Sequence, residues 1–131
     1  MSRRKKNRKT RENEARAAVK HLRAVLRYLR ASPRKVKPLA DMIRGLKVDA
    51  ALAVLDHTPR AAARPMAAML RSAVSNAASR QDVDIDRLVV KEVQVSPGPM
   101  LKRWMPRALG RATRIYRRTS HISFRLEAGK K

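Results

Sequence analysis

Positive charge gathers at the two ends of this 131-residue chain and nearly cancels in its middle. Residues 1–37 carry a net charge of +13, residues 38–101 of +1, and residues 102–131 of +9. Blocks of like charge repel one another and resist packing into a core, whereas a near-neutral segment with apolar residues can fold. The distribution therefore predicts a folded middle flanked by two extensions that bind a polyanion, with nucleic acid as the first candidate.

The overall composition excludes several classes of protein. An apolar fraction of 44% is too high for a disordered basic tail of the histone or protamine type. The absence of cysteine excludes disulfide bonds, a thiol nucleophile and a cysteine-based zinc site. No apolar run approaches the ~18 residues of a membrane span, and the basic start is not followed by an apolar segment. We expect a soluble single domain without a secretory signal and with no membrane partner.

The N-terminal region supports two different predictions. Residues 1–11 contain no apolar residue after Met1, so we expect them to be disordered until they bind a partner. Beyond them, apolar residues recur at the spacing of an amphipathic helix, at Leu22, Val25, Leu26 and Leu29. The same segment can also be interpreted as a short strand that ends at Ser32. The periodicity favours the helix.

Ser32 and Pro33 mark the start of the next helix. Serine is a favoured N-cap because its hydroxyl accepts a hydrogen bond from the first turn, and proline is favoured at the first helical position. One apolar face follows at helical spacing, formed by Val36, Leu39, Ala40 and Ile43. Gly45 ends the helix. Pro38 lies in the second turn, where it removes a backbone hydrogen bond and should kink or weaken the helix.

Two further helices are predicted in the near-neutral middle. Asp49 is expected to cap a short helix that runs to about Asp56, and Thr58 with Pro59 is expected to start a longer one. The longer helix keeps core spacing at Met66, Met69, Leu70, Ala73, Val74 and Ala77. Its abundant alanine allows a neighbouring helix or sheet to approach closely.

The pattern changes to β after an acidic turn at residues 82–86. One run of branched and apolar residues contains Leu88, Val89, Val90, Val93 and Val95, and a second alternates through Ile122, Phe124 and Leu126. Ile115 falls on the opposite parity, so we expect a bulge or twist near Arg117 and Arg118. Residues 96–111, between the runs, contain three prolines and two glycines. These residues favour a hairpin with a long basic extension.

The predicted hairpin mixes cations with large apolar residues. Lys102, Arg103, Arg107 and Arg111 are interleaved with Met100, Leu101, Trp104, Met105 and Leu109. Guanidinium groups bind phosphate, and tryptophan or arginine planes stack on unpaired bases, so this mixture favours RNA. The basic stripe continues through Arg114, Arg117, Arg118 and Arg125, with Thr119, Ser120 and His121 as partners for phosphate or sugar. The alternative is a solvated hairpin whose Trp104 and Leu109 fold back onto the core.

Nothing in the sequence indicates catalysis. His21, His57 and His121 are isolated from carboxylates at ligand spacing, so we expect no metal site and no general base. Asp82, Asp84 and Asp86 match the start of a calcium loop, but Arg87 replaces the required glycine. Motifs for nucleotide binding, zinc proteases and serine hydrolases are also missing. We expect a protein that is not an enzyme and has no cofactor.

Four blocks of sequence resemble the bacterial ribosomal large-subunit protein twenty-two family. The blocks are S-P-R-K-V at residues 32–36 with I-R-G at 43–45, L-R-S-A-V-S-N-A at 70–77, G-P-M-L-K-R-W-M-P-R-A at 98–108, and R-T-S-H-I at 118–122. Each block is weak alone, but all four in order at the expected spacing are highly specific. The chain departs from the family pattern at Pro38, at Leu109, and in its basic extension before Ala24.

The resemblance implies an α+β fold in which three helices pack on a small antiparallel sheet, with a long extended β-hairpin and a basic N-terminal arm. It implies that residues 24–31 form a strand, against the periodicity, and we adopt that prediction. Residues 1–23 would be a basic extension, disordered off the ribosome. Residues 24–131 would form one domain, with the hairpin at about 88–126 and its tip at about 98–111.

The resemblance also implies a function and its site residues. The protein would be a structural constituent of the large ribosomal subunit in the cytoplasm that binds large-subunit ribosomal RNA, aids its assembly and lines the nascent-peptide exit tunnel. The RNA contacts would be Arg34, Lys35, Arg44, Lys102, Arg103, Arg107, Arg111, Arg114, Arg117, Arg118, Thr119, Ser120 and His121. The tunnel-lining tip would be Lys102, Arg103, Trp104, Met105, Pro106, Arg107 and Ala108, a region linked in the family to macrolide resistance.

The implied partners are large-subunit ribosomal RNA, other large-subunit proteins and the nascent polypeptide, but not DNA. A DNA-compacting protein would share the charge without needing the proline-rich tip. A membrane-active basic protein is suggested only by residues 14–30, if they are helical.

Overall fold

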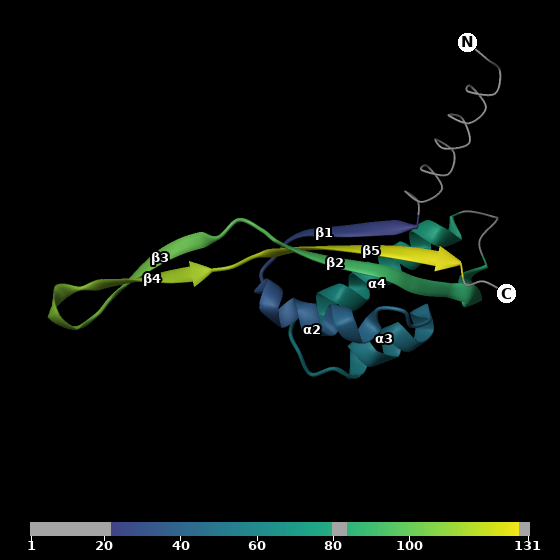
Figure 1. Cartoon of the computed structure of the whole chain (residues 1–131), viewed down its shortest axis with the longest axis horizontal. Helices are drawn as coiled ribbons and strands as arrows, with labels where there is room; N and C mark the ends of the chain where they lie inside the picture. Colours follow the sequence, from purple (N-terminus) through teal and green to yellow (C-terminus); the bar gives the residue numbers. More distant parts are fainter. Residues whose placement is uncertain (1–21, 80–83, 129–131) are drawn as a thin grey trace, which may run out of the picture.

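The computed structural model describes residues 22–79 and 84–128, which form three helices and five strands (Figure 1). The strands are β1 (Arg23–Leu29), β2 (Leu88–Pro97), β3 (Leu101–Pro106), β4 (Ala112–Arg117) and β5 (Ser120–Ala128). The helices are α2 (Pro33–Ile43), α3 (Val48–His57) and α4 (Ala63–Ala78). Short 3₁₀ turns lie at η1 (Ile85–Arg87) and η2 (Ala108–Gly110). Residues 1–21, which make up most of the predicted N-terminal extension, lie outside the described residues. Residues 80–83 and 129–131 also lie outside them.

A three-stranded antiparallel sheet, in the order β1-β5-β2, forms one layer, and the three helices lie against one face of it (Figure 1). Every second residue of β5 points into the core between the layers, because side chains alternate along a strand. Ile122 and Phe124 are fully buried there, and Leu126 is 2% exposed. This unit is called the body below. The predicted α+β class, with helices on an antiparallel sheet and an extended hairpin, is confirmed.

Strand β1 shows that the helical periodicity of residues 22–29 was misleading. Arg23 to Leu26 pair in antiparallel register with β5, so that Ala24 lies opposite Phe124. Tyr28 has a φ of +58°, which no α-helix contains. Only Ala24 of this strand is buried. The apolar spacing therefore reflects a half-covered edge strand with a register shift between Leu26 and Leu29 rather than the face of a helix.

Helix α2 follows the prediction except at its cap. Pro33 occupies the first position, and Val36, Leu39, Ala40 and Ile43 have no exposed surface. Ser32 has the extended backbone of an N-cap, but its side chain makes no capping hydrogen bond, so the predicted serine cap is wrong in that respect. Pro38 does not end the helix. It lies on the exposed side, where water can reach the carbonyl group that its missing N–H would have bonded.

The predicted starts of the two later helices are wrong. Lys47 is the N-cap of α3, and Asp49 lies inside its first turn. Thr58 closes α3 instead of opening α4, because its hydroxyl donates a 2.5 Å hydrogen bond to the carbonyl of Val54. Its extended backbone agrees with the restriction that the following Pro59 imposes. Helix α4 begins only at Ala63.

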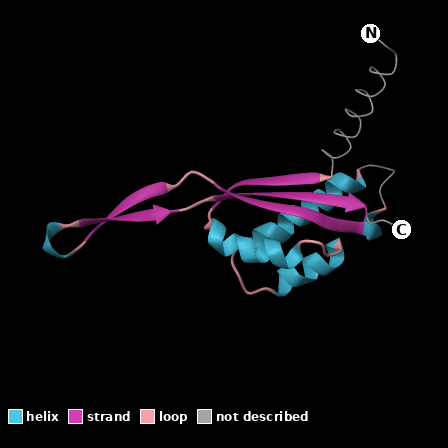
Figure 2. Ribbon diagram, viewed as in Figure 1, coloured by secondary structure: helices cyan, strands magenta, loops and turns pink. Residues whose placement is uncertain are grey.

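Beyond the body, the chain continues as a second two-stranded sheet formed by β3 and β4, which projects from one end of the molecule (Figure 2). We call residues 101–117 the distal hairpin. It is separated from the body by residues 98–100 on one side and by Arg118 and Thr119 on the other. The irregularity predicted near Arg117 and Arg118 is thus present as a break between the two sheets.

Three hydrogen bonds stabilise the break between the two sheets. The backbone N–H of Gly98 donates to the carbonyl of Thr119 over 2.9 Å, and the Thr119 hydroxyl donates to the carbonyl of Pro99 over 2.6 Å. Across the sheet, the N–H of Tyr28 donates to Nδ1 of His121 over 3.0 Å. A Cβ atom at Gly98 would lie 2.5 Å from Oγ1 of Thr119 and 3.1 Å from Nε2 of His121. Glycine is therefore required here for close approach.

We expect Gly98→Ala to destabilise the protein by about 1–3 kcal/mol, since Thr119 must move and lose its hydrogen bond to Pro99. Urea denaturation of Gly98→Ala, Thr119→Ala and the double variant measures the effect as a cycle. The cost of Gly98→Ala should fall when Thr119 is alanine, because the oxygen that the new methyl group meets is gone. Equal costs in both backgrounds would contradict this account of the break.

Candidate nucleic-acid interface

The distal hairpin presents two chemically different faces. Cross-strand partners share a face, and β3 pairs with β4 so that Trp104 lies opposite Arg114 and Lys102 opposite Tyr116. These four residues form a cationic and aromatic face. The other face is formed by Leu101, Arg103, Met105, Thr113, Ile115 and Arg117. It combines the apolar side chains of Leu101, Met105 and Ile115 with two arginines and has no aromatic ring. Ile115 alone among the residues of β3 and β4 is partly covered.

Trp104 is the clearest chemical feature of the first face. Its side chain is 60% exposed, and the guanidinium carbon of Arg114 lies 5.0 Å from the centre of its rings. A cation–π pair uses one side of an aromatic plane and leaves the other side open to a flat partner such as a base. Leu109 is 92% exposed. The alternative in which Trp104 and Leu109 fold back onto the core is therefore wrong.

The cations of the distal hairpin are not neutralised by the described carboxylates. The ion pairs within residues 22–79 and 84–128 all lie in the body or its loops: Asp41 with Arg44, Asp56 with Arg71, Asp84 with Arg87, Glu127 with Lys91, and Glu92 with Arg125. Five cations of the body are therefore paired with carboxylates. The distal hairpin leaves its charge for a partner, which is the arrangement expected of a polyanion-binding extension.

The far end of the distal hairpin is a tight turn at residues 107–111. The N–H of Arg107 donates to the carbonyl of Arg111 over 2.7 Å, and both Leu109 and Gly110 have positive φ. Arg107 and Ala108 therefore stand at the end itself. The other predicted tip residues, Lys102 to Pro106, lie along β3.

Two predicted contact residues are directed inward. Thr119 is 6% exposed and Ser120 has no exposed surface. The hydroxyl of Thr119 is already bonded to Pro99, as described above, and the side chain of Ser120 points with the core residues of β5. The Thr119 hydroxyl thus serves the break, whereas the buried Ser120 hydroxyl has no hydrogen-bond partner among the described residues. His121 is partly exposed, and its ring packs edge-on against Tyr28 with centroids 4.8 Å apart.

The predicted contact residues at the two ends of α2 differ in whether their side chains already have partners within the protein. Arg34 and Lys35 are exposed in its first turn. Arg44 instead holds Asp41 at 3.0 Å and donates from Nη2 to the carbonyl of Val93 over 3.1 Å. Its guanidinium therefore links the end of α2 to β2 as well as meeting solvent.

Sequence reasoning missed two cations that lie near Lys35 and the end of β4. Arg30 and Arg60 line a pocket together with Lys35, Arg117 and Arg118. Arg30 precedes Ser32 and Pro33, and Arg60 follows Pro59. Both belong to short connections that lead into helices. A search for cations in those connections would have found them, although it would not have shown that they meet.

The described part of the chain contains neither a metal-binding cluster nor a membrane-spanning helix. No group of three histidine, aspartate or glutamate side chains there is placed to hold a metal ion. None of the described helices combines the length and the apolar character needed to cross a membrane.

Comparison with known proteins identifies one family. The model of the family described as ribosomal protein L22p/L17e matches residues 24–127. The large ribosomal subunit protein uL22 of Desulfitobacterium hafniense (strain DSM 10664 / DCB-2) is 50% identical over 105 residues, which cover 80% of this chain and 92% of the relative. The proteins of the same name from Myxococcus xanthus (strain DK1622) and Anaeromyxobacter sp. (strain K) are 49% and 48% identical. These matches cover 82% and 87% of this chain, and 96% and 79% of the relatives.

Proposed function

The chain belongs to the ribosomal protein L22p/L17e family, and we propose that it binds large-subunit ribosomal RNA through its distal hairpin. Members of this family are structural, non-enzymatic components of the large ribosomal subunit in the cytoplasm. The observation that carries the proposal is the pairing of unneutralised cations with an exposed indole on one face of β3 and β4.

Each group on this face has a part in binding RNA. Lys102 and Arg114 would bind phosphate oxygens, since charge-assisted hydrogen bonds to phosphate are the strong ones available to these side chains. The open side of Trp104 would stack on an unpaired base, a contact that folded RNA offers in its loops and bulges. Duplex DNA keeps its bases stacked inside, so the indole favours RNA as the partner.

We further propose that the end of the distal hairpin lines the nascent-peptide exit tunnel. The distal hairpin projects away from the body along the long axis of the molecule (Figure 1). The turn at its end therefore lies well away from the body (Figure 1). Lys102 to Ala108 would narrow the passage, and the apolar side chains of Leu101, Met105 and Ile115 on the other face are chemically suited to a passing unfolded chain. Changes at this end would alter macrolide sensitivity.

The remaining parts of the proposal concern assembly. The body would dock on the surface of the subunit beside other large-subunit proteins. The distal hairpin would hold segments of RNA together, with the ordering of both partners offset by phosphate pairing and counterion release.

Trp104 supplies the test, because it is the single tryptophan of the chain and so reports on its own surroundings. Deproteinised bacterial large-subunit RNA should change its fluorescence on binding. Trp104→Ala should weaken binding by about 1–3 kcal/mol, the usual worth of one stacked base, while leaving thermal unfolding nearly unchanged. Trp104→Phe is the matched control, since it keeps an aromatic plane and should retain part of the affinity.

The competing hypothesis is tested in the same titration. Duplex DNA of equal phosphate concentration should displace the RNA poorly. The proposal is rejected when duplex DNA competes as well as ribosomal RNA, or when Trp104→Ala binds RNA with the affinity of the wild type.

A further inference from the structure

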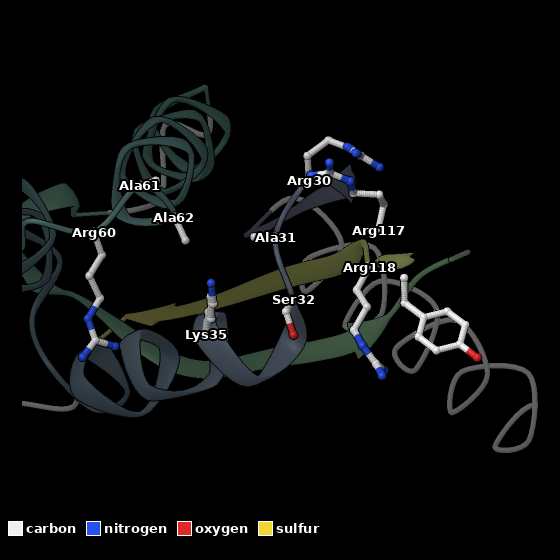
Figure 3. Close-up of a pocket in the computed structure, with 10 residues that line it drawn as sticks. Arg30, Ala31, Ser32, Lys35, Arg60, Ala61, Ala62, Arg117 and Arg118 are labelled. Carbon is white, nitrogen blue, oxygen red and sulfur yellow. The ribbon is translucent and has the colours of Figure 1, made fainter. Parts of the chain in front are cut away.

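A basic pocket lies at the inner end of the distal hairpin, where three segments distant in sequence meet. Arg30 comes from the connection between β1 and α2, and Lys35 follows it in the first turn of α2. The connection from α3 to α4 contributes Arg60, and the end of β4 and the break after it contribute Arg117 and Arg118. Figure 3 shows Lys35 between Arg60 on one side and the other three cations on the other. The pocket has a volume of about 790 Å³, within the ~300–1,000 Å³ of typical ligand sites. We call it the base pocket.

The charge of the base pocket is uncompensated. No carboxylate lines it, and within the part of the chain that the structure describes none of its five cations takes part in an ion pair. Each of the five is exposed. Five cations brought together without a counter-charge repel one another, so an anion that binds among them relieves the repulsion as well as making contacts.

Helix α2 adds to this field. Its N-terminal end opens at Ser32, which also lines the base pocket. The serine side chain does not cap the helix, and the first turn contains no acidic residue. The partial positive charge of the helix end is therefore left for a ligand, in support of the side-chain cations.

We propose that the base pocket binds the sugar-phosphate backbone of an RNA strand, at a second site separate from the face of Trp104. This inference rests on the proposed function and deepens it, because it gives the body its own RNA contact. Four of the five cations are arginines, whose planar donors match phosphate oxygens in pairs. The rest of the lining is mostly small, with Ala31, Ala61 and Ala62, which lets a backbone approach closely.

Continuity with the distal hairpin favours RNA over an acidic protein segment as the occupant. Arg117 belongs to both surfaces, since it ends β4 and lines the base pocket. Tyr116 also lines the pocket, and the guanidinium carbon of Arg118 lies 5.9 Å from its ring centre. A strand that follows the cations of β4 inward thus reaches the base pocket without leaving basic surface. Binding would be independent of sequence, as contacts to phosphate are.

The test uses the three pocket cations that belong neither to the distal hairpin nor to the break, Arg30, Lys35 and Arg60. The pocket variant carries Arg30→Gln, Lys35→Gln and Arg60→Gln. The control variant carries Arg27→Gln, Lys37→Gln and Arg64→Gln, which remove the same charge from exposed positions that do not line the pocket. Thermal unfolding should show that both variants fold.

Affinity for deproteinised bacterial large-subunit RNA is then measured over a range of salt concentrations. The pocket variant should bind roughly ten- to a hundredfold more weakly at ~0.1 M salt, and its slope of log K against log salt should be shallower by about 2, at ~0.7–0.9 per phosphate contact. The control variant should stay close to the wild type. Phosphorothioate footprinting should show a cluster of phosphates that the wild type and the control protect and the pocket variant does not.

Three outcomes overturn the inference. The pocket variant and the control weaken binding equally, or the phosphate cluster stays protected in the pocket variant, or the pocket variant binds RNA normally yet fails to enter large subunits. The last result would assign the base pocket to an acidic segment of another protein. Failure of the proposed function is distinguishable, because in that case the wild type itself would not prefer ribosomal RNA to duplex DNA.

Discussion

Replacing residues 102–116 with a two-residue Asn-Gly turn should leave the body folded and remove a large part of the salt-dependent binding to ribosomal RNA. Leu101 and Arg117 are register partners, and Asn-Gly is the favoured two-residue connection between paired strands. None of the buried core residues lies in the deleted segment. The midpoint of thermal unfolding should therefore stay within a few degrees of the wild type.

The expected loss of binding follows from the charges removed. The deleted segment contains five cations and no carboxylate. At ~0.7–0.9 per neutralised phosphate, the slope of log K against log salt should become shallower by about 4. Between ~50 and ~200 mM salt the wild type would then lose about 250-fold more affinity than the shortened protein. A filter-binding series with large-subunit RNA measures both slopes.

A second variant separates charge from shape. Glutamine at the five deleted cations, Lys102, Arg103, Arg107, Arg111 and Arg114, keeps the distal hairpin but neutralises it. Its salt slope should match that of the shortened protein, whereas its residual affinity should be higher because Trp104 remains. Unchanged slopes in both variants would place the RNA contact elsewhere, and a loss of cooperative unfolding in the shortened protein would make the distal hairpin part of the core.

Phe124→Ala should have the largest effect on stability, about 3–5 kcal/mol. Phe124 has no exposed surface and lies on the central strand β5, with Ala24 and Val93 as its partners on the two sides. Truncation leaves a cavity where all three strands meet the helices. Domains are stable by only ~5–15 kcal/mol, so a loss of this size removes a large share of the total. Urea denaturation followed by circular dichroism gives the value.

Trp104→Ala is the control for Phe124→Ala, because it truncates an aromatic residue that is exposed. It should change the free energy of unfolding by no more than ~0.5 kcal/mol. The two aromatic residues thus have opposite expected effects, one on stability and one on RNA binding. Should Phe124→Ala fail to fold, Phe124→Leu provides a measurable loss of about 1–2 kcal/mol. Equal stability of the Phe124 and Trp104 variants would contradict the assignment of the core.

The sequence predicted the faces of the helices better than their ends. The four apolar residues of α2 recur at helical spacing and are all fully buried, because burial follows directly from periodicity. The caps depend on a choice between competing hydrogen bonds. The Thr58 hydroxyl donates a hydrogen bond to a carbonyl of α3 instead of accepting one from an N–H of α4. A threonine followed by proline is compatible with either hydrogen bond.

Strand β1 could not be predicted from its own residues. Its apolar spacing fits a helix, and the pairing that makes it a strand is supplied by β5, about 100 residues later in the sequence. The family resemblance contained that information and gave the correct assignment. Local propensity was overridden by tertiary pairing, as is common for edge strands.

The candidate interface was predictable where it is continuous in sequence. The cations of residues 102–118 stand out because a strand-turn-strand segment keeps them together. The base pocket assembles side chains from three segments distant in sequence, and no spacing rule links Arg30 with Arg60. The burial of Thr119 was also hidden, since it depends on the break between the sheets, whereas the burial of Ser120 follows the alternation of side chains along β5.

The break between the two sheets separates two timescales of folding. β3 and β4 pair only with each other and are joined by a short turn, so they close by a local and fast step. The body must first bring β1 to β5 across most of the chain, which is slower. An isolated two-stranded hairpin is only marginally stable in water. The distal hairpin can therefore open and re-form many times around an obstacle while the body remains intact as its anchor.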